Sequence, residues 1–391
     1  MPAPLESSLP DAAACARWIP RAAIVLLGLG LLLIHSGAAA PALAEGPGSP
    51  FFQKQLAYAI AGLLLMGLAA VVPPRLWRAA APGLLAASAL ILVAVLAPGV
   101  GATVNGARRW FRLGGWSIQP SEFARIMLVL GLAATVAWTD TKGAFARTFL
   151  PAGLVVGFAG LVVVEPDVGG ALLIGAVGVW TLWVAGRTFA VGVLSAGALA
   201  LPAVAFLPGF EHVRTRIQIF LNPEADPLGR GYQIVQSIGA IASGGWTGVG
   251  LGEGMARHGY LPEHETDFLF ATLTQELGFI GAAAALMLAL GIVGLCLATA
   301  ARAKDRFGAL LAAGVGAAFG TAAALNVGVV CGVLPPKGLA FPLLSYGGSS
   351  LVAMMLGLGL VVSVAQEAAR AFEAGAGANT VPAGVPGEAL P

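Results

Sequence analysis

Long apolar runs occupy most of this chain and fix the environment in which it folds. Of the 391 residues, 58% belong to the AVILMFWYC set and only 10% are charged, whereas about 25% of the residues in soluble domains are charged. The runs are too long, and too rich in Ala, Leu and Gly, for the short alternating strands of an outer-membrane barrel. The sequence therefore predicts an all-α polytopic membrane protein and excludes a soluble enzyme.

Ten segments reach the length of about 20 mostly apolar residues that a membrane-spanning helix needs. They cover residues 19–43, 52–72, 80–97, 123–139, 148–164, 169–185, 188–207, 268–299, 308–333 and 341–366. A large hydrophilic loop, at about 208–267, separates the seventh from the eighth. We expect one membrane domain over residues 17–370, flanked by disordered cytoplasmic tails at 1–16 and 371–391.

Two interpretations of the first apolar segment remain open. Arg17 and Arg21 precede its apolar core, and residues 41–44 end it with an A-x-A-like site, as in a cleaved signal peptide. The apolar run is longer than the usual core of a signal peptide, which favours a retained helix. Either interpretation leaves Phe51 outside, so the topology of the remaining segments is the same.

The distribution of charges between the two sides indicates where the polar chemistry lies. With the N-terminus inside, eleven of the 21 cations fall on the inner side, as the positive-inside rule requires. The other ten cations and 12 of the 19 acids fall on the outer side. Because the positive-inside rule disfavours cations on the outer side, we infer that these cations contribute to a functional site there. The three cysteines are isolated and indicate neither a zinc site nor a disulfide framework.

The loop at 98–122 contains three arginines, Arg108, Arg109 and Arg112, and it leads into the fourth predicted helix. Ser121 is placed to cap that helix, and Glu122 and Arg125 then lie three residues apart on one face. Guanidinium groups match phosphate oxygens, so the cluster favours a phosphate or pyrophosphate site. The alternative is that the arginines snorkel at the membrane interface beside tryptophans of the aromatic belt.

A short outer turn at 165–170 carries two carboxylates, Glu165 and Asp167. Asp167 precedes the sixth predicted helix, where its side chain would accept backbone N–H groups. This capping role is at least as good an explanation as a functional one. A functional role for these two carboxylates is favoured only if they face the same cavity as the arginines.

The large loop contains a predicted interfacial helix and a glycine-rich segment. Ile234, Val235, Ile238 and Ile241 fall on one face of a helix that would lie along the membrane surface. Glycines at every second position over 248–254 then break any helix. Such glycines allow the backbone to approach a ligand or another helix closely.

Three carboxylates and a histidine stand at the mouth of the eighth predicted segment. They are Glu263, His264, Glu265 and Asp267. A carboxylate at a water–lipid boundary suits general-base chemistry, or it can hold a divalent cation through oxygen ligands. The alternative is a group of solvated loop acids, which spacing alone slightly favours.

A second glycine-rich stretch opens the last predicted segment. Pro335-Pro336-Lys337-Gly338 precedes Phe341-Pro342-Leu343-Leu344-Ser345-Tyr346-Gly347-Gly348. Small residues inside a span usually permit tight helix packing. A helix broken at this point and lining a polar cavity is the sharper hypothesis.

Together these motifs resemble the SEDS family, the FtsW/RodA-type peptidoglycan glycosyltransferases. The matching residues, in family order, are Asn105-Gly106-x-x-Arg109-Trp110, Gln119-Pro120-Ser121-Glu122-Phe123, Pro166-Asp167-x-Gly169, Gly231-Tyr232-Gln233, Gly248-x-Gly250-x-Gly252, Leu261-Pro262-Glu263, Thr266-Asp267-Phe268 and Pro342 to Ser350. The segment Lys337-Gly338-Leu339 is more similar to the FtsW/SpoVE branch than to the RodA branch.

The resemblance implies a ten-helix fold that polymerises lipid II at the outer face of the bacterial cytoplasmic (inner) membrane and releases undecaprenyl pyrophosphate. It implies three kinds of partner, namely lipid II, a class B penicillin-binding protein, and components of the divisome or elongasome. It implies no nucleic acid and no organic cofactor.

The resemblance also assigns roles by position. Asp267 takes the place of the family's essential aspartate and is implied to be the general base, alone or with a divalent cation, Mn²⁺ or Mg²⁺. The predicted substrate-binding residues are Arg109, Glu122, Arg125, Arg216, Glu263, Lys337 and Ser345.

Three positions depart from the family pattern. Arg125 stands where lysine is usual, which keeps the charge but changes its geometry. Glu265 stands where histidine is usual, with His264 displaced by one residue, and Ala322 stands where glutamine is frequent. The carboxylate and the cation at the core of the implied site are retained.

Two competing functions remain open at the level of sequence. A non-catalytic flippase or transporter of a lipid-linked precursor would also use arginine-lined cavities and broken helices. An O-antigen polymerase or ligase would share the chemistry but should lack these ordered motifs.

Overall fold

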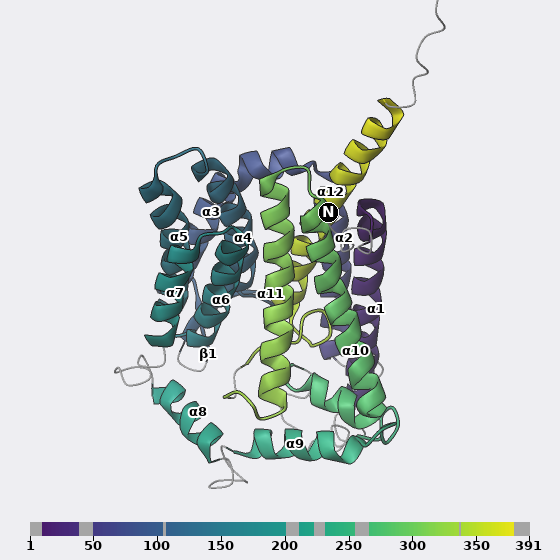
Figure 1. Cartoon of the computed structure of the whole chain (residues 1–391). Helices are drawn as coiled ribbons and strands as arrows, with labels where there is room; N and C mark the ends of the chain where they lie inside the picture. Colours follow the sequence, from purple (N-terminus) through teal and green to yellow (C-terminus); the bar gives the residue numbers. More distant parts are fainter. Residues whose placement is uncertain are drawn as a thin grey trace, which may run out of the picture.

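The computed structural model describes residues 10–38, 50–104, 107–200, 211–222, 231–254, 266–335 and 338–378. Helices dominate these residues (Figure 1). They are α1 (Ala12–Ala38), α2 (Pro50–Val71), α3 (Pro74–Leu96), α4 (Pro120–Thr139), α5 (Ala144–Val164), α6 (Val168–Val184), α7 (Thr188–Ala200), α8 (Glu211–Leu221), α9 (Tyr232–Gly244), α10 (Leu269–Arg302), α11 (Arg306–Val330) and α12 (Gly348–Ala378).

The all-α polytopic architecture is confirmed. Eight of the described helices are long and apolar enough to cross a membrane, and α6 is a shorter apolar helix of 17 residues. The seventh expected span corresponds to α7, which is described for 13 residues, up to Ala200. In Figure 1 the long helices stand side by side, whereas α8 and α9 lie across one end of the bundle, within the large loop predicted from the sequence.

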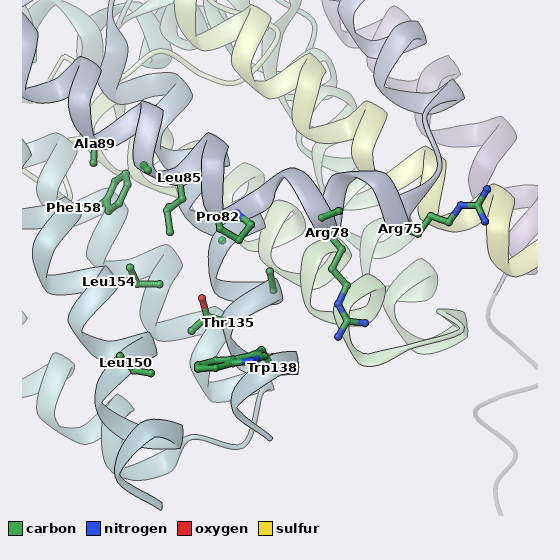
Figure 2. Close-up of a pocket in the computed structure, with 14 residues that line it drawn as sticks. Arg75, Arg78, Pro82, Leu85, Ala89, Thr135, Trp138, Leu150, Leu154 and Phe158 are labelled. Carbon is green, nitrogen blue, oxygen red and sulfur yellow. The ribbon is translucent and has the colours of Figure 1, made fainter. Parts of the chain in front are cut away.

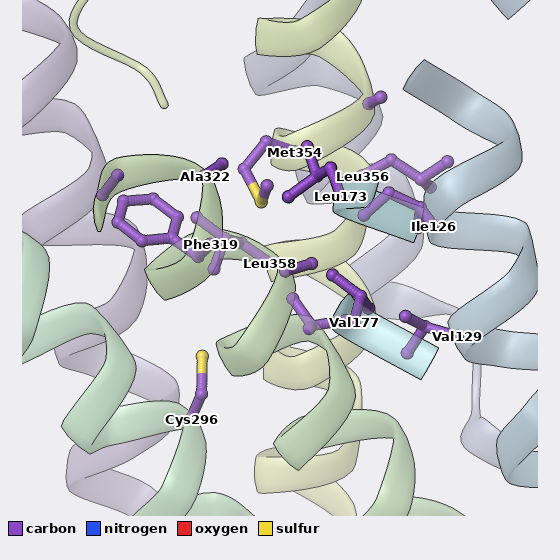
Figure 3. Packing of buried hydrophobic residues seen from close by; sticks show 14 of the residues in the cluster. Ile126, Val129, Leu173, Val177, Cys296, Phe319, Ala322, Met354, Leu356 and Leu358 are labelled. Carbon is purple, nitrogen blue, oxygen red and sulfur yellow. The ribbon is translucent and has the colours of Figure 1, made fainter. Parts of the chain in front are cut away.

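Helix α11 occupies the centre of the bundle. It packs against α4 and α6 on one side and against α10 and α12 on the other. Figure 3 shows the resulting core, in which side chains of these five helices converge, among them Ile126, Val129, Leu173, Val177, Cys296, Phe319, Ala322, Met354, Leu356 and Leu358. Glycines bring the helices close together, since a Cβ on Gly314 would lie only 2.5 Å from Val129 Cγ1.

The first helix is an integral part of this bundle. Helix α1 packs against α10 and α12, and its Ile19, Leu26 and Leu33 side chains are fully buried. A leader removed on export would leave these partners uncovered, so the packing favours the retained-helix interpretation.

Several predicted boundaries were wrong. Helix α1 already begins at Ala12 and α12 continues to Ala378, so helix extends into both expected tails. Helix α12 begins at Gly348 rather than 341, because residues 341–347 form a non-helical loop in which Leu343 has a φ of 64°. Helix α4 begins at Pro120, with Gln119 as its N-cap residue, so the predicted capping role of Ser121 was also wrong.

The loop at 98–122 folds as a small antiparallel sheet that the all-α prediction did not include. Its strands are β1 (Ala102–Val104), β2 (Ala107–Leu113) and β3 (Trp116–Ile118), in the order β1-β2-β3. The Tyr58 hydroxyl of α2 donates to the carbonyl of Ser117 at 3.2 Å, and its ring packs edge-on against Trp116. The sheet is therefore anchored to the bundle.

The glycine-rich loop after α9 packs on a kink in α10. Gly248 (φ 84°), Gly250 (φ 109°) and Gly252 (φ 77°) adopt backbone conformations that favour glycine. The N–H of Val249 donates to the carbonyl of Gln275 at 3.0 Å, and α10 is kinked at Gly278 (φ 68°). The predicted close approach of this backbone to another helix is confirmed.

The buried face of α9 differs from the predicted one. Ile234, Ser237, Ala240 and Gly244 are the buried residues, whereas Ile238 is exposed. The polar Ser237 is buried because its hydroxyl donates to the carbonyl of Val330 at 2.8 Å.

We expect Gly248→Ala to destabilise the protein, because the added Cβ would clash with the carbonyl oxygen of Glu276 and the residue has a positive φ. A strained position of this kind costs about 1–3 kcal/mol. The readout is the thermal midpoint of the purified protein in detergent. Gly239→Ala, in α9, is the matched control, since its added Cβ would meet open space. Equal midpoints for the two variants would contradict the inference that the glycine-rich loop packs closely on α10.

Candidate functional site

The polar residues singled out in the sequence gather at one end of the bundle. Successive spanning helices alternate in direction, so the sheet, the start of α4, the α5–α6 turn, the start of α10 and the end of α11 share that end. Helices α8 and α9 and strand β1 mark it in Figure 1. We call it the outer end.

An ion pair connects the sheet to the α5–α6 turn. Arg109 of β2 lies 3.6 Å from the Asp167 carboxylate (Nη1 to Oδ1), and both side chains are partly buried. Asp167 also caps α6, because its Oδ1 accepts the N–H of Gly170 at 2.9 Å. The predicted cap is therefore confirmed, and the same carboxylate holds an arginine of the candidate site.

Glu165 is fully buried beside this pair, in the turn that follows α5. Neither of its carboxylate oxygens has a hydrogen-bond partner. Burial raises the pKa of Glu165 to about 8, and the charge of Asp167 adds to this rise, while Arg109 opposes it. Glu165 therefore carries a proton at neutral pH.

A second ion pair lies at the start of α4. Arg125 Nη2 donates to Glu122 Oε2 at 2.7 Å, and the Arg125 residue is only 3% exposed. The predicted placement of these two residues on one helical face is confirmed. The N–H of Gln119, just before the helix, donates to the hydroxyl of Ser349 in α12 at 2.8 Å.

Asp267 stands in the turn that precedes α10, and a buried asparagine fixes this turn. Asn326 of α11 donates from Nδ2 to the carbonyl of Asp267 at 2.8 Å and to the carbonyl of Leu339 at 2.6 Å. The Asp267 carboxylate itself lies beside Gly338, where a Cβ would be 3.1 Å from Oδ2. The turn at 266–268 and the segment at 338–340 are thus held as one unit.

The segment at 341–349 joins this unit to the first ion pairs. The N–H of Phe341 donates to Ser345 Oγ at 3.1 Å, and Gln55 of α2 donates to the carbonyl of Ser345 at 3.2 Å. Ser349, in the same segment, binds Gln119. The stretch before Gly348 is a loop rather than a broken helix, and it connects the surroundings of Asp267 to the start of α4. That it lines a polar cavity stays a prediction.

Ser345 was predicted to bind substrate, and in the structure it shapes the loop. The residue is 1% exposed, and its hydroxyl and carbonyl oxygens both accept hydrogen bonds from the protein. Its predicted role in binding substrate stays a prediction.

Several predicted site residues cannot be placed. Glu263 and Lys337 lie outside the described residues, as do His264 and Glu265. Arg216 belongs to α8, whose backbone is described without this side chain. Their predicted roles stay predictions.

Few of the described carboxylates at the outer end are placed where they could hold a metal ion together. Within the described parts of the chain, no group of three or more His, Cys, Asp and Glu side chains is arranged to hold a metal ion. Mg²⁺ usually binds one or two carboxylates together with substrate phosphates. Asp267 would supply one such carboxylate, and its role as a metal ligand stays a prediction.

Sequence reasoning missed three polar residues that hold the site together. Gln55, Asn326 and Glu276 are all buried, and they belong to α2, α11 and α10. Ser36 of α1 donates to Glu276 Oε2 at 3.2 Å, which connects α1 to α10 beside the glycine-rich loop. Asn326 is a polar residue within an apolar run, and this signal could have identified it. Gln55 and Glu276 follow other polar residues and carried no such signal.

The arrangement can bind an anion and move a proton. Arg109 and Arg125 present guanidinium groups at a membrane boundary, and neighbouring carboxylates hold them in place. Asp267 supplies a carboxylate on a fixed turn. These features define a multi-pass membrane protein with an acid-and-arginine site at the outer end of its helices.

The comparisons with known proteins agree on a family. A family model described as "Cell cycle protein", covering FtsW, RodA and SpoVE, matches residues 17–370. The chain belongs to this family.

Relatives match along most of their length. A "Probable peptidoglycan glycosyltransferase FtsW" of Trichlorobacter lovleyi is 38% identical over 87% of this chain and 90% of its own. A protein with the same description from a Thioalkalivibrio species is 40% identical over 89% of this chain and 88% of its own.

Solved structures share the fold. A chain from "Structural coordination of polymerization and crosslinking by a peptidoglycan synthase complex" matches with a TM-score of 0.74 and 31% identity, covering 90% of this chain and 97% of that one. The rod shape determining protein RodA of Thermus thermophilus matches with a TM-score of 0.66 and 28% identity, covering 89% of this chain and 96% of that one.

We expect the thermal midpoint of Glu165→Gln, relative to the wild type, to rise between pH 4.5 and about pH 8 and to level off above pH 8. The folded protein keeps a proton on Glu165 up to about pH 8, whereas the unfolded chain releases it near the ordinary pKa of 4.5. The contribution of Glu165 to the free energy of unfolding of the wild type is therefore largest below pH 4.5, and it is lost as the pH rises to about 8. Glutamine does not ionise and escapes this loss.

Thermal midpoints in detergent across this pH range test the prediction. The control is Glu373→Gln, at an exposed position in α12, which should shift the midpoint equally at every pH. A constant difference between Glu165→Gln and the wild type would mean that Glu165 is ionised in the folded protein.

Proposed function

We propose that this protein is a peptidoglycan glycosyltransferase that polymerises lipid II into glycan strands for cell division or cell shape and releases undecaprenyl pyrophosphate. One observation carries the proposal. The Asp267 carboxylate is held on a fixed turn at the same end of the bundle as two partly buried arginine–carboxylate pairs. The descriptions of the FtsW relatives, which match nearly the whole chain, support the same activity.

Asp267 acts as the general base in this proposal. It accepts the proton of the attacking sugar hydroxyl as the oxygen of that hydroxyl bonds to the anomeric carbon of the donor. A positioned base typically contributes about 10²–10⁴-fold to the rate. Asn326 fixes the Asp267 backbone, because its Nδ2 donates to the Asp267 carbonyl at 2.8 Å, and the turn that carries the carboxylate is thereby held in place.

Arg109 and Arg125 stabilise the leaving group. As the bond from the anomeric carbon to the pyrophosphate oxygen breaks, its electron pair stays on that oxygen, and a preorganised cation lowers the energy of the developing charge. Asp167 and Glu122 hold the two guanidinium groups in place before substrate binds. Arg216, Glu263 and Lys337 are further proposed substrate contacts.

A divalent cation, Mn²⁺ or Mg²⁺, would be held by Asp267 together with pyrophosphate oxygens. When bound, it would neutralise charge on the leaving pyrophosphate. The arginines perform the same task from the protein side.

The outer end faces the periplasm in this proposal, and the protein resides in the cytoplasmic membrane. Supporting this orientation, the opposite end carries Arg75, Arg78, Lys142, Arg187 and Arg306, as the positive-inside rule requires. The proposed partner is a class B penicillin-binding protein within a divisome or elongasome. A structural relative comes from a complex that couples polymerization and crosslinking, which supports such a pairing.

Asp267→Asn should reduce glycan polymer formation from lipid II by roughly 10²–10⁴-fold, because the amide cannot accept the hydroxyl proton. Folding should be unaffected, since the backbone carbonyl that binds Asn326 is retained. The measurement is a gel assay of polymer length with purified protein, its penicillin-binding partner and lipid II, with and without Mn²⁺ or Mg²⁺. Glu373→Gln, far from the outer end, is the matched control.

Undiminished polymer from a folded Asp267→Asn protein would overturn the base assignment. The competing transporter function makes a different prediction in proteoliposomes. If labelled lipid II crossed the bilayer at the same rate in wild type and Asp267→Asn, and no polymer formed in either, the protein would be a flippase.

A further inference from the structure

A cavity of about 870 Å³ lies between α3, α4 and α5, at the end of the bundle opposite the candidate site (Figure 2). Its volume falls within the range of about 300–1,000 Å³ that is typical of ligand pockets. Figure 2 shows Leu85, Leu154 and Phe158 along its apolar part, with Arg78 toward the other side. The cavity thus combines an apolar wall with a cationic mouth.

The sequence explains why the helices leave this space. On one side α3 and α4 meet closely, because the Leu85 side chain covers Gly131, where a Cβ would lie 2.8 Å from Leu85 Cδ1. Pro82 lies within α3, where it cannot donate to the carbonyl four residues earlier. The lining between these points includes Ala79, Ala86 and Ala134, whose short side chains leave the space unfilled.

Cations outnumber acids at the mouth of the cavity. Arg75 and Arg78 line it and are exposed. Lys142 lies over the ring of Trp138, another lining residue, with Nζ 5.0 Å from the ring centroid. Arg147 adds a further exposed cation in the first turn of α5.

Asp305 and Asp140 form the ion pairs described on this side of the membrane, and neither acid neutralises the mouth. Asp305 pairs with Arg78 at 3.5 Å, but both side chains are about half exposed, and such a pair contributes about 0–1 kcal/mol. Asp140 is engaged by Arg187 and by Arg306, the latter at 2.8 Å. Arg78 therefore remains able to bind an anion.

We propose that this cavity binds an anionic glycerophospholipid of the inner leaflet. Its acyl chain occupies the space between α3, α4 and α5, and its phosphate contacts Arg75 and Arg78. Basic pockets between transmembrane helices on the cytoplasmic side bind anionic head groups, and guanidinium groups match phosphate oxygens. The apolar wall selects a lipid over a soluble phosphate.

The test is native mass spectrometry of the delipidated protein in detergent, titrated with phosphatidylglycerol or phosphatidylcholine. The wild type should retain phosphatidylglycerol more strongly. A double variant, Arg75→Ala with Arg78→Ala, should lose this retention by about thirtyfold, since each of the two cations contributes about 1 kcal/mol. The matched control, Lys304→Ala with Arg370→Ala, removes two exposed cations from the same membrane side and should bind as the wild type does.

A third variant tests the acyl-chain part of the site. Ala86→Trp fills the cavity from its lining while leaving both arginines in place, and should also weaken retention. Thermal midpoints establish that each variant is folded. Four results would each overturn the proposal, namely equal retention of phosphatidylcholine, equal loss in the control pair, full displacement by soluble glycerol phosphate, or tighter retention of a polyprenyl phosphate.

Discussion

The absence of water inside a bilayer is the constraint on which this structure depends, because every polar group at membrane depth must find its partner within the protein. Hydrogen bonds within the helices meet most of this demand, and several buried polar side chains meet the rest by binding groups in other helices or loops. Asn326 binds two carbonyls, Gln55 binds the loop before α12, and Ser237 binds the end of α11. The same hydrogen bonds also position the candidate site. The stability of the fold and the geometry of the site therefore depend on the same hydrogen bonds.

The membrane fold could be predicted because apolar length is a local property of the sequence. Helix boundaries were harder, since α12 begins only after a loop whose shape depends on Gln55, a residue about 290 positions away. The sheet at 102–118 was missed for a similar reason, because its strands are short and its anchor is Tyr58 in another helix. The predicted face of α9 failed because Ser237 is buried through a hydrogen bond that periodicity does not register.

Part of the candidate site could be predicted because charged residues are scarce in this chain, so the few that occur stand out. Glu122 and Arg125 followed from helical spacing, and Asp167 followed from its place before α6. The pairing of Arg109 with Asp167 required the fold, because the two residues are on a strand and a turn that are separate in the sequence. The burial of Glu165 could also be recognised only in the fold, because its neighbours in the sequence do not indicate how α5 and α6 pack around it.

The double hydrogen bond of Asn326 has a consequence for how this protein can be regulated. One amide holds the turn of Asp267 and the segment of Leu339 together, and it projects from α11, which contacts both halves of the bundle. A tilt of α11 would therefore shift both walls around the carboxylate in concert, without altering the distance between them. Any displacement of α11 would therefore act on the turn of Asp267 and on the segment of Leu339 together.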